Sequence, residues 1–392
     1  MPNTLLTPTQ VTREALRILH QKLRFVGSIN RQYDDSFAKK GAKIGDTLKI
    51  RLPNQYTVRT GATLSAQDTT ESSVSLQIAT QKGVDLNFTS SDLTLSLDDF
   101  GKRVLNPAMA VLAAAIESDA LNMRKDVNNQ VNNTGAAITW AKVLAGRKLM
   151  QDNLAPEEPR YALLNTQDNA DLVDALKGLF NDQARLGKQY REGVMGSSAG
   201  FDFMESTHLS KQTRGAGNSA YLSNGVNQTG ASIAVDTGTG TIKQGEIVTF
   251  AGVFSVHPET KISTGVLMQF ALTADYAGGA GNIAITPAIV ATGATQNVSN
   301  TIADNSAMTI AGTASTDYGQ SLLYQEDAFA FATADLVMPQ GVDFSAREVY
   351  DGVSMRIVRQ YDINNDKFPC RLDVLYGYKT LRGYTACRLA NN

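Results

Sequence analysis

The chain is organised around residues 91–129, SDLTLSLDDFGKRVLNPAMAVLAAAIESDALNMRKDVNN. Asn106 is a favourable helix N-cap, and Pro107 suits the first helical position, where a backbone N–H would have no partner. Apolar side chains then recur at helical spacing, and we place in the buried core of this helix Val111, Leu112, Ala115 and Ile116. A continuous helix over 107–129 is roughly 35 Å long at about 1.5 Å per residue.

The wider region 91–132 is therefore predicted to be a spine against which sheets lie. Three consecutive alanines, 113–115, leave room for another element to pack closely against its middle. We expect the charged residues to lie mostly off the apolar face, namely Glu117, Asp119, Arg124 and Lys125. No catalytic group stands out along the spine.

Residues 1–32 are predicted to form an N-terminal arm that ends in a helix. Thr7, Pro8 and Gln10 match a capping box at its start. Its apolar face is formed by Val11, Ala15, Leu16, Ile18, Leu19 and Leu23. This face requires a partner, either in its own domain or in a neighbouring subunit.

Residues 33–90 change to the alternating pattern of β-strands, at 46–52, 73–80 and 84–88. The polar, glycine-containing segment after the first strand has too few apolar residues for a core. We predict a long two-stranded excursion whose tip projects from the body, and a hairpin of this kind is marginal alone in water. Three of its residues are candidate inter-subunit contacts: Arg51, Arg59 and Glu71.

The rest of the chain predicts a body interrupted by a β-rich insertion. Helices and strands mix in 133–222 and 317–352, which favours an α/β body. Charges become sparse in 223–316, where short β-like runs alternate with Gly-rich turns, as in a small barrel or sandwich. We expect 353–392 to form strands that return to the body, so the overall class is α+β with an inserted all-β domain.

Composition narrows the range of functions. The 392 residues exceed what one hydrophobic core usually serves, so we expect several domains. With 36 basic and 38 acidic residues and no basic block, direct reading of a DNA or RNA sequence is not expected. The two cysteines, Cys370 and Cys387, are predicted to be buried free thiols. The first residues do not resemble a signal peptide and no apolar run is long enough to span a membrane, so we expect a soluble, cytoplasmic chain.

The motifs of catalysis and metal binding are missing from the sequence. The three histidines have no partner at zinc-binding spacing. Asp362, Asn364 and Asp366 begin like a calcium loop, but Lys367 occupies the position of the required glycine, which favours a polar hairpin turn. The Gly-rich turns at 215–217 and 237–245 lack the spacing of phosphate-binding loops. We expect no enzyme activity, no cofactor and no metal.

The order of these parts resembles the major capsid proteins of tailed bacteriophages with the HK97-type fold, and more closely the P22-like coat family with its inserted domain. Four passages carry the resemblance. Residues 45–76 (GDTLKIRLPNQYTVRTGATLSAQDTTESSVSL) are similar to the extended loop, and 95–113 (LSLDDFGKRVLNPAMAVLA) to the start of the spine helix. Residues 245–261 (GEIVTFAGVFSVHPETK) resemble the first strands of the insertion, and 353–382 the closing strands.

The resemblance implies a structural protein that forms pentamers and hexamers in an icosahedral shell around packaged double-stranded DNA. It implies a procapsid built with a scaffolding protein, filled through a portal protein in the host cytoplasm, and a place in the virion. Because the arm starts within the first ten residues, we expect the scaffolding protein to be a separate chain. Two alternatives stay open: an encapsulin-like compartment shell, and a non-viral β-rich binding module.

Overall fold

The computed structural model describes residues 8–32, 47–59, 61–64, 66–68, 71–88, 104–176, 196–364 and 367–391. The chain divides into two compact units. Unit 1 comprises Met1–Ile50, Ser73–Leu121 and Phe329–Leu381, and unit 2 comprises Arg51–Ser72, Asn122–Ala328 and Arg382–Asn392. Each unit combines helices with β-sheet, which confirms the mixed α and β class predicted from the sequence.

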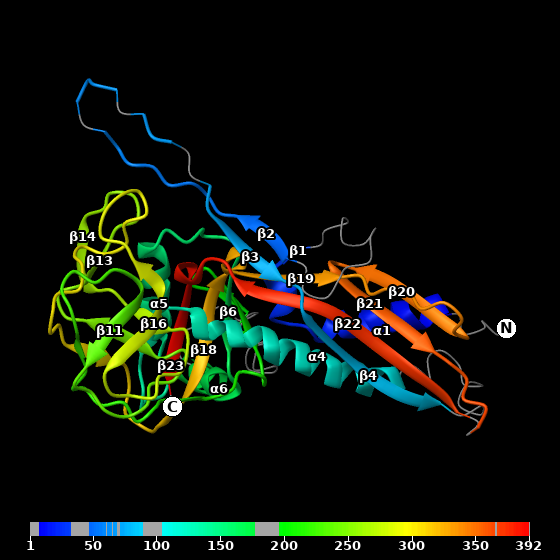
Figure 1. Ribbon diagram of the computed structural model, residues 1–392. Helices are drawn as coiled ribbons and strands as arrows, with labels where there is room; N and C mark the ends of the chain where they lie inside the picture. The colour runs from blue at the N-terminus through cyan, green and yellow to red at the C-terminus, as the bar shows by residue number, and fades with distance from the viewer. Residues whose placement is uncertain are drawn as a thin grey trace. The chain divides into compact units, whose positions relative to one another are not determined.

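The sheet of unit 1 is built around β22, its longest strand (Figure 1). Its strands are β1 (Asn30–Gln32), β4 (Thr80–Phe88), β19 (Phe329–Ala334), β20 (Phe344–Tyr350), β21 (Val353–Arg359) and β22 (Phe368–Thr380). They follow the order β1-β19-β22-β21-β20, with β4 also paired to β22, and only the β1–β19 pair is parallel. A separate antiparallel pair joins β2 (Thr47–Arg51) to β3 (Ser73–Gln77).

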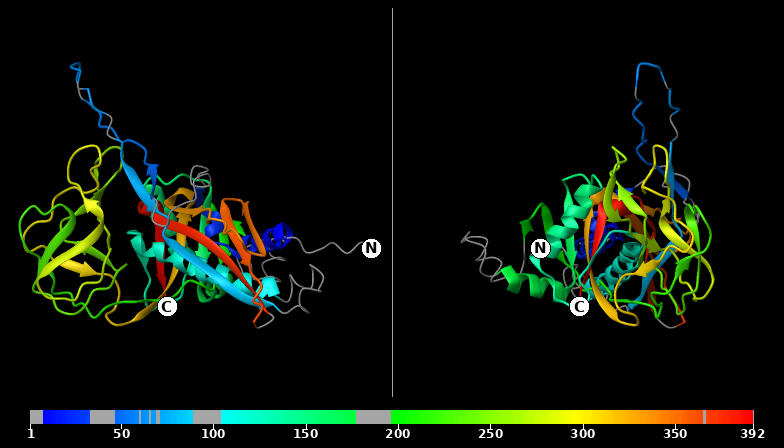
Figure 2. Two further views of the ribbon diagram at one scale, coloured as in Figure 1. Left: turned by 45° about the vertical axis from the view of Figure 1, so that its right-hand side comes forward. Right: turned by 90° about the vertical axis from the view of Figure 1, so that its left-hand side faces the viewer.

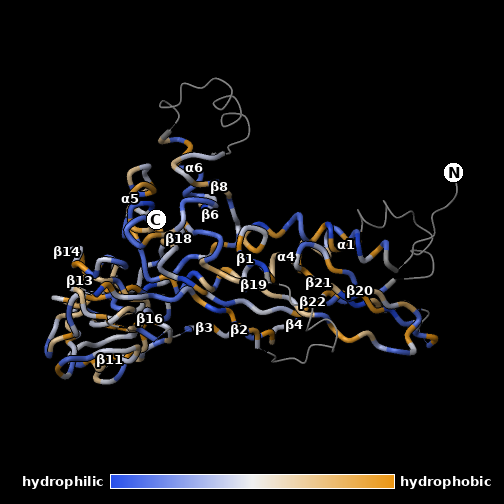
Figure 3. Tube along the Cα trace, turned by 90° about the horizontal axis from the view of Figure 1, so that it is seen from above, coloured by the Kyte–Doolittle hydropathy of each residue, from blue (hydrophilic) through white to orange (hydrophobic). Residues whose placement is uncertain are grey.

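Helix α1 (Pro8–Lys22) covers part of this sheet. It contacts β20, β21 and the helix α4, and all six predicted face residues are buried. The hydropathy of α1 alternates along its length, as Figure 3 shows. The 3-10 turn η1 (Val26–Ser28) follows, and the Phe25 ring packs edge-on against Phe329 of β19 at 5.5 Å. The arm helix therefore buries its apolar face within its own unit.

Helix α4 (Asn106–Leu121) differs from the predicted spine helix in three respects. The α-helix ends at Leu121 and continues only as the 3-10 turn η4 (Asn122–Asp126), instead of running to residue 129. Val111 was predicted to be in the core, but its side chain is 66% exposed because it lies off the buried stripe. Glu117, expected off the apolar face, is buried. Of the other three predicted core residues, Leu112 and Ile116 are buried and Ala115 is half-buried.

Polar contacts hold the C-terminal part of α4 against the sheet of unit 1. Asp119 accepts a hydrogen bond from the Tyr376 hydroxyl at 2.6 Å and pairs with the Lys82 ammonium at 2.6 Å. Burial, together with the neighbouring Asp119 carboxylate, raises the pKa of Tyr376 far above its ordinary value, so the phenol stays a donor. One carboxylate thus links the helix to both β22 and β4.

Unit 2 contains a second sheet of seven strands. Its order is β5-β23-β18-β6-β8-β7, with β9 also paired to β18. The strands are β5 (Gln130–Asn132), β6 (Arg160–Leu164), β7 (Ser197–Ser198), β8 (Phe201–Glu205), β9 (Gln212–Thr213), β18 (Asp317–Gln325) and β23 (Ala386–Asn391). Helix α5 (Trp140–Asp152) packs on β23 and β5, and helix α6 (Thr166–Leu176) packs on β6. Two 3-10 turns lie next to the strands of this sheet: η5 (Glu326–Ala328) follows β18, and η6 (Gly383–Thr385) precedes β23.

A third sheet in unit 2 closes on itself around a separate core. Its order is β10-β11-β16-β15-β12-β17. The strands are β10 (Leu222–Ser223), β11 (Gly230–Asp236), β12 (Ile247–Phe250), β15 (Phe270–Leu272), β16 (Gly281–Ile289) and β17 (Met308–Ile310), and a hairpin of β13 (Phe254–Val256) and β14 (Ser263–Leu267) adjoins them. Hydrogen bonds from Met308 N to Tyr221 O (2.9 Å) and from Ser223 N to Ser306 O (3.0 Å) join the two end strands.

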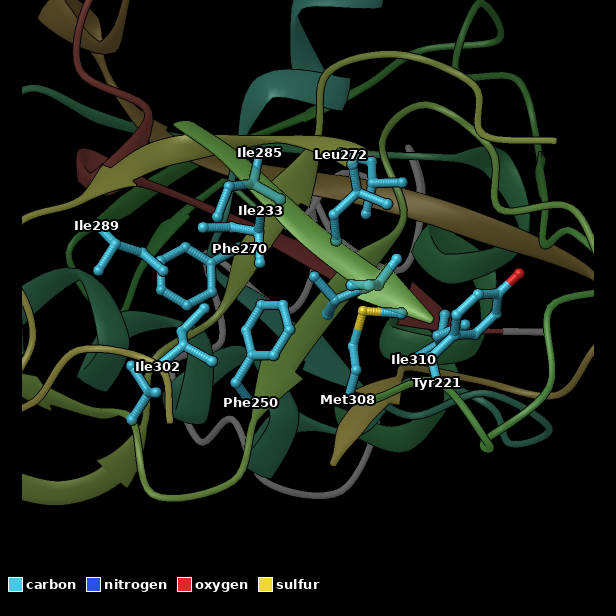
Figure 4. Close-up of a cluster of buried hydrophobic side chains, with 14 of the residues drawn as sticks. Tyr221, Ile233, Phe250, Phe270, Leu272, Ile285, Ile289, Ile302, Met308 and Ile310 are labelled. Atoms are coloured by element: carbon cyan, nitrogen blue, oxygen red, sulfur yellow. The ribbon is translucent and has the colours of Figure 1, made fainter. Parts of the chain in front are cut away.

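The interior of this closed sheet is apolar. Figure 2 shows the strands in green and yellow around a common interior, and Figure 4 shows the side chains pointing toward one another there. The buried residues include Ile233, Phe250, Phe270, Leu272, Ile285, Ile289, Ile302, Met308 and Ile310. A core of this kind needs no side chain from the neighbouring seven-stranded sheet.

The contacts between the closed sheet and the rest of unit 2 include several polar ones. The Gln269 side chain accepts a hydrogen bond from Gln130 N at 2.7 Å and donates one to Gln130 O at 3.0 Å. Arg388, fully buried in β23, donates to Gly245 O at 2.6 Å. Gln269 therefore bonds the backbone of β5 as a neighbouring strand would.

The last part of the chain differs from the prediction. Residues 329–352 and most of 353–392 were expected with the body formed by 133–222. Instead, Phe329–Leu381 belongs to unit 1, and only Arg382–Asn392 pairs with the sheet of unit 2 through β23. The position of β22 is set by its pairing with β4 and β19, which lie far away along the chain. The local sequence pattern of β22 does not indicate these partners.

Candidate assembly interface

The segment 52–72, here called the extended loop, is the most exposed part of the described chain. It begins after β2 and returns at β3, and the bond from Leu52 N to Ser72 O (2.9 Å) prolongs that strand pair by one step. From residue 53 to residue 72 every described side chain is exposed. Figure 1 shows two extended limbs joined at a tip. The extended loop is thus a surface with no core of its own.

One side chain connects the two limbs. The Gln67 side chain accepts hydrogen bonds from Thr57 N at 2.9 Å and Thr57 Oγ1 at 3.0 Å, and it donates to Thr57 O at 2.6 Å. The amide of Gln67 therefore satisfies both backbone groups of Thr57, as a paired strand would. This pair could not be predicted from the sequence, because no local pattern marks two residues that meet ten positions apart.

The structure brings together two of the three predicted contact residues. Arg51 and Glu71 form an ion pair at 3.3 Å at the base of the extended loop, with side chains 78% and 56% exposed. An ion pair this exposed contributes little, about 0–1 kcal/mol. Arg59 lies apart from them and folds back on the tip, where its guanidinium donates to the carbonyls of Gly61 and Thr63.

Three large apolar side chains lie in water on the extended loop. Tyr56 is 56% exposed, Val58 94% and Leu64 82%. Scattered exposed apolar residues are ordinary, but three within nine positions of a loop without a core form a concentrated apolar surface. Their apolar character was readable in the sequence, and only the structure reveals that nothing in the described subunit covers them.

The described residues offer little for chemistry. Across the described ranges, no group of three or more His, Cys, Asp or Glu side chains is placed to hold a metal ion. Cys370 and Cys387 are buried and free, as predicted, and burial raises the pKa of each thiol to about 12. Neither thiol therefore supplies a thiolate at neutral pH. Among the residues whose placement is described, no helix is long and apolar enough to cross a membrane.

Comparison with known proteins identifies a family. The family model described as "P22 coat protein - gene protein 5" matches residues 29–386. No curated protein matches the chain.

Three solved structures are similar to this chain. The first, described as Mycobacterium phage Che8, has 13% identity and a TM-score of 0.49, with 94% of this chain and 90% of that chain covered. The capsid of Cyanophage P-SCSP1u has 12% identity and a TM-score of 0.45, with 93% and 86% covered. The mature capsid of bacteriophage PhiM1 has 9% identity and a TM-score of 0.44, with 94% and 87% covered.

Proposed function

The chain belongs to the P22 coat protein family, and we propose that its copies assemble as HK97-type subunits into pentamers and hexamers of an icosahedral phage head. The protein is a structural coat protein of a shell-forming family. The single observation that carries the proposal is the family match over residues 29–386, which spans both units. In this role the protein performs no catalytic step and needs no cofactor.

The extended loop is the proposed clasp between neighbouring subunits. Covering an apolar side chain of the size of Val58 or Leu64 stabilises a contact by about 1.5–3 kcal/mol when burial is complete. The hydrogen bonds between Thr57 and Gln67 join the two limbs within one subunit. A loop that already holds its shape loses less conformational entropy on binding.

Residues 223–316 are proposed to be the inserted domain of this family. The closed sheet with its own apolar interior supports this assignment. The polar junction at Gln269 and Arg388 supports a separately built module. In the shell, this domain would contact neighbouring capsomers.

The proposed partners follow from the role in assembly. A separate scaffolding protein would guide a procapsid in the host cytoplasm, and a portal protein would admit double-stranded DNA. The balance of 36 basic and 38 acidic residues suits a shell that encloses DNA without contacting its bases specifically. After assembly, the protein would be part of the virion.

Size-exclusion chromatography and negative-stain electron microscopy test the proposal. The chain is produced alone and together with a candidate scaffolding protein encoded beside it. We expect closed icosahedral particles or capsomer rings, with uniform closed particles only when the scaffold is present. Uniform closed shells from the chain alone would favour the compartment-shell alternative, and a monomer under every condition would overturn the proposal.

A further inference from the structure

A fully buried arginine lies where three segments of unit 2 meet. Arg388 is 0% exposed in β23, which pairs with β5 and β18 in the seven-stranded sheet. Its Nη1 donates at 2.6 Å to the carbonyl oxygen of Gly245, which precedes β12 of the closed sheet. Gly245 also lies against η4, because a Cβ built on it would be 3.0 Å from the Cβ of Lys125. The guanidinium of Arg388 therefore lies at the junction of β23, η4 and the closed sheet.

One edge of this guanidinium has no acceptor within the described part of the chain. The Nε and Nη2 atoms of Arg388 are buried, and no described residue accepts a hydrogen bond from either of them. These two nitrogens lie on the same edge of the planar group, and their N–H bonds point the same way. This geometry binds the oxygens of carboxylates and phosphates in a bidentate manner. Because a buried charged donor without a partner destabilises a fold, two such donors on one edge indicate a ligand that accepts from both.

The charges around Arg388 favour an anion as this ligand. Arg124 of η4 is also buried, at 3% exposed, and adds a second positive charge to the same interior. Burial, together with the charge of Arg124, lowers the pKa of Arg388 to about 9, and the carboxylate of Asp126 opposes this effect only in part. Arg388 is still a cation at pH 7, so a negative charge beside its Nε and Nη2 atoms would neutralise it.

We propose that the Nε–Nη2 edge of Arg388 binds a small monovalent anion such as chloride, and that this anion stabilises the junction of the closed sheet with β23. A chloride ion accepts both N–H bonds and supplies the charge that the buried guanidinium requires. Because the site exists only in the folded chain, the anion should stabilise unit 2. Once the site is largely filled, each tenfold rise in anion concentration lowers the unfolding equilibrium constant about tenfold. The site belongs to the subunit and does not depend on the proposed shell.

Urea unfolding of the full chain in sodium chloride tests the anion site. The fluorescence of Trp140 is the readout, because it is the one tryptophan of the chain and lies in α5 of unit 2. Chloride is varied from about 0.1 M to about 1 M, and sodium gluconate, whose anion is much larger, keeps the ionic strength constant. We expect the unfolding equilibrium constant to fall about tenfold over this range. An unchanged constant, as expected if the two donors bind only water, would overturn the proposal.

A matched pair of variants localises the effect. Arg388→Met removes the guanidinium and keeps an unbranched side chain, so its unfolding should not depend on chloride. Arg17→Met, which removes an arginine of α1 whose side chain is 54% exposed, should keep the wild-type dependence. Equal chloride dependence in Arg388→Met and the wild type would refute the assignment to Arg388.

A direct measurement covers the case in which Arg388→Met does not fold. Crystals of the wild-type chain are grown in sodium bromide, because bromide replaces chloride and scatters X-rays anomalously. We expect an anomalous peak beside the Nε and Nη2 atoms of Arg388. A structure in which this edge of the guanidinium has no such peak would overturn the proposal.

Discussion

Replacing Leu64 by alanine should weaken shell assembly without weakening the subunit. The Leu64 side chain is 82% exposed, so the folded subunit has little packing to lose, and its unfolding free energy should change by less than about 0.5 kcal/mol. In the proposed shell a neighbouring copy covers this side chain. The substitution removes three carbon atoms at about 0.8 kcal/mol each, or about 2 kcal/mol when scaled by the exposed fraction. With one extended loop per subunit, the concentration needed for assembly should rise about thirtyfold.

The assay is light scattering or size-exclusion chromatography across a range of subunit concentrations, with thermal unfolding of the subunit alongside. Thr63→Ala is the matched control, because Thr63 is an exposed neighbour on the same loop whose described bond uses only its backbone carbonyl. It should assemble at the wild-type concentration. If Leu64→Ala also assembles at the wild-type concentration, no partner covers the extended loop at this point and the clasp assignment is wrong.

Two further predictions concern the stability of unit 1. A Cβ on Gly377 would lie 2.1 Å from the backbone oxygen of Gln77, so Gly377→Ala should destabilise the unit by about 2 kcal/mol in urea unfolding. Gly27→Ala, where nothing lies within 4 Å, should be close to neutral, and equal losses in the two variants would contradict this reasoning. Asp373 is fully buried and pairs with Arg356 at 2.6 Å and with Arg371 at 2.9 Å, so Asp373→Asn should cost about 3 kcal/mol, and an unchanged urea midpoint would show that these pairs contribute nothing.

Local patterns in the sequence were sufficient to predict the amphipathic helices and strands. The helix at the arm followed from apolar residues at helical spacing, and Val11, Leu16 and Leu19 are buried as expected. Strands were expected within 353–392, and β21, β22 and β23 form there. Such elements have one face toward the core and one toward water, and their period therefore appears in the residues themselves.

The buried polar residues could not be predicted in this way. Glu117 and Arg124 were expected off the apolar face of the spine, yet both are buried. Glu117 is satisfied by backbone N–H groups of the turn after α1, and Arg124 donates to Ser210 at 2.8 Å. These partners lie far away along the chain, and composition alone places charged residues in water.

The contacts within the extended loop, at the candidate interface, could likewise be predicted only in part from the sequence. Its length and polar character predicted a projecting excursion, and Arg51 and Glu71 do meet at its base. The bonds of Gln67 to Thr57 and the exposure of Leu64 depend on how the two limbs are paired. Pairing across a loop is a three-dimensional property that spacing along one limb does not encode.

Cryo-electron microscopy of the particles formed with the scaffolding protein would show where the extended loop lies in the assembly. We expect an icosahedral shell in which the extended loop of each subunit lies against a second copy of the chain, with Val58 and Leu64 covered. Particles without icosahedral order, or a shell in which these two side chains still face solvent, would contradict it.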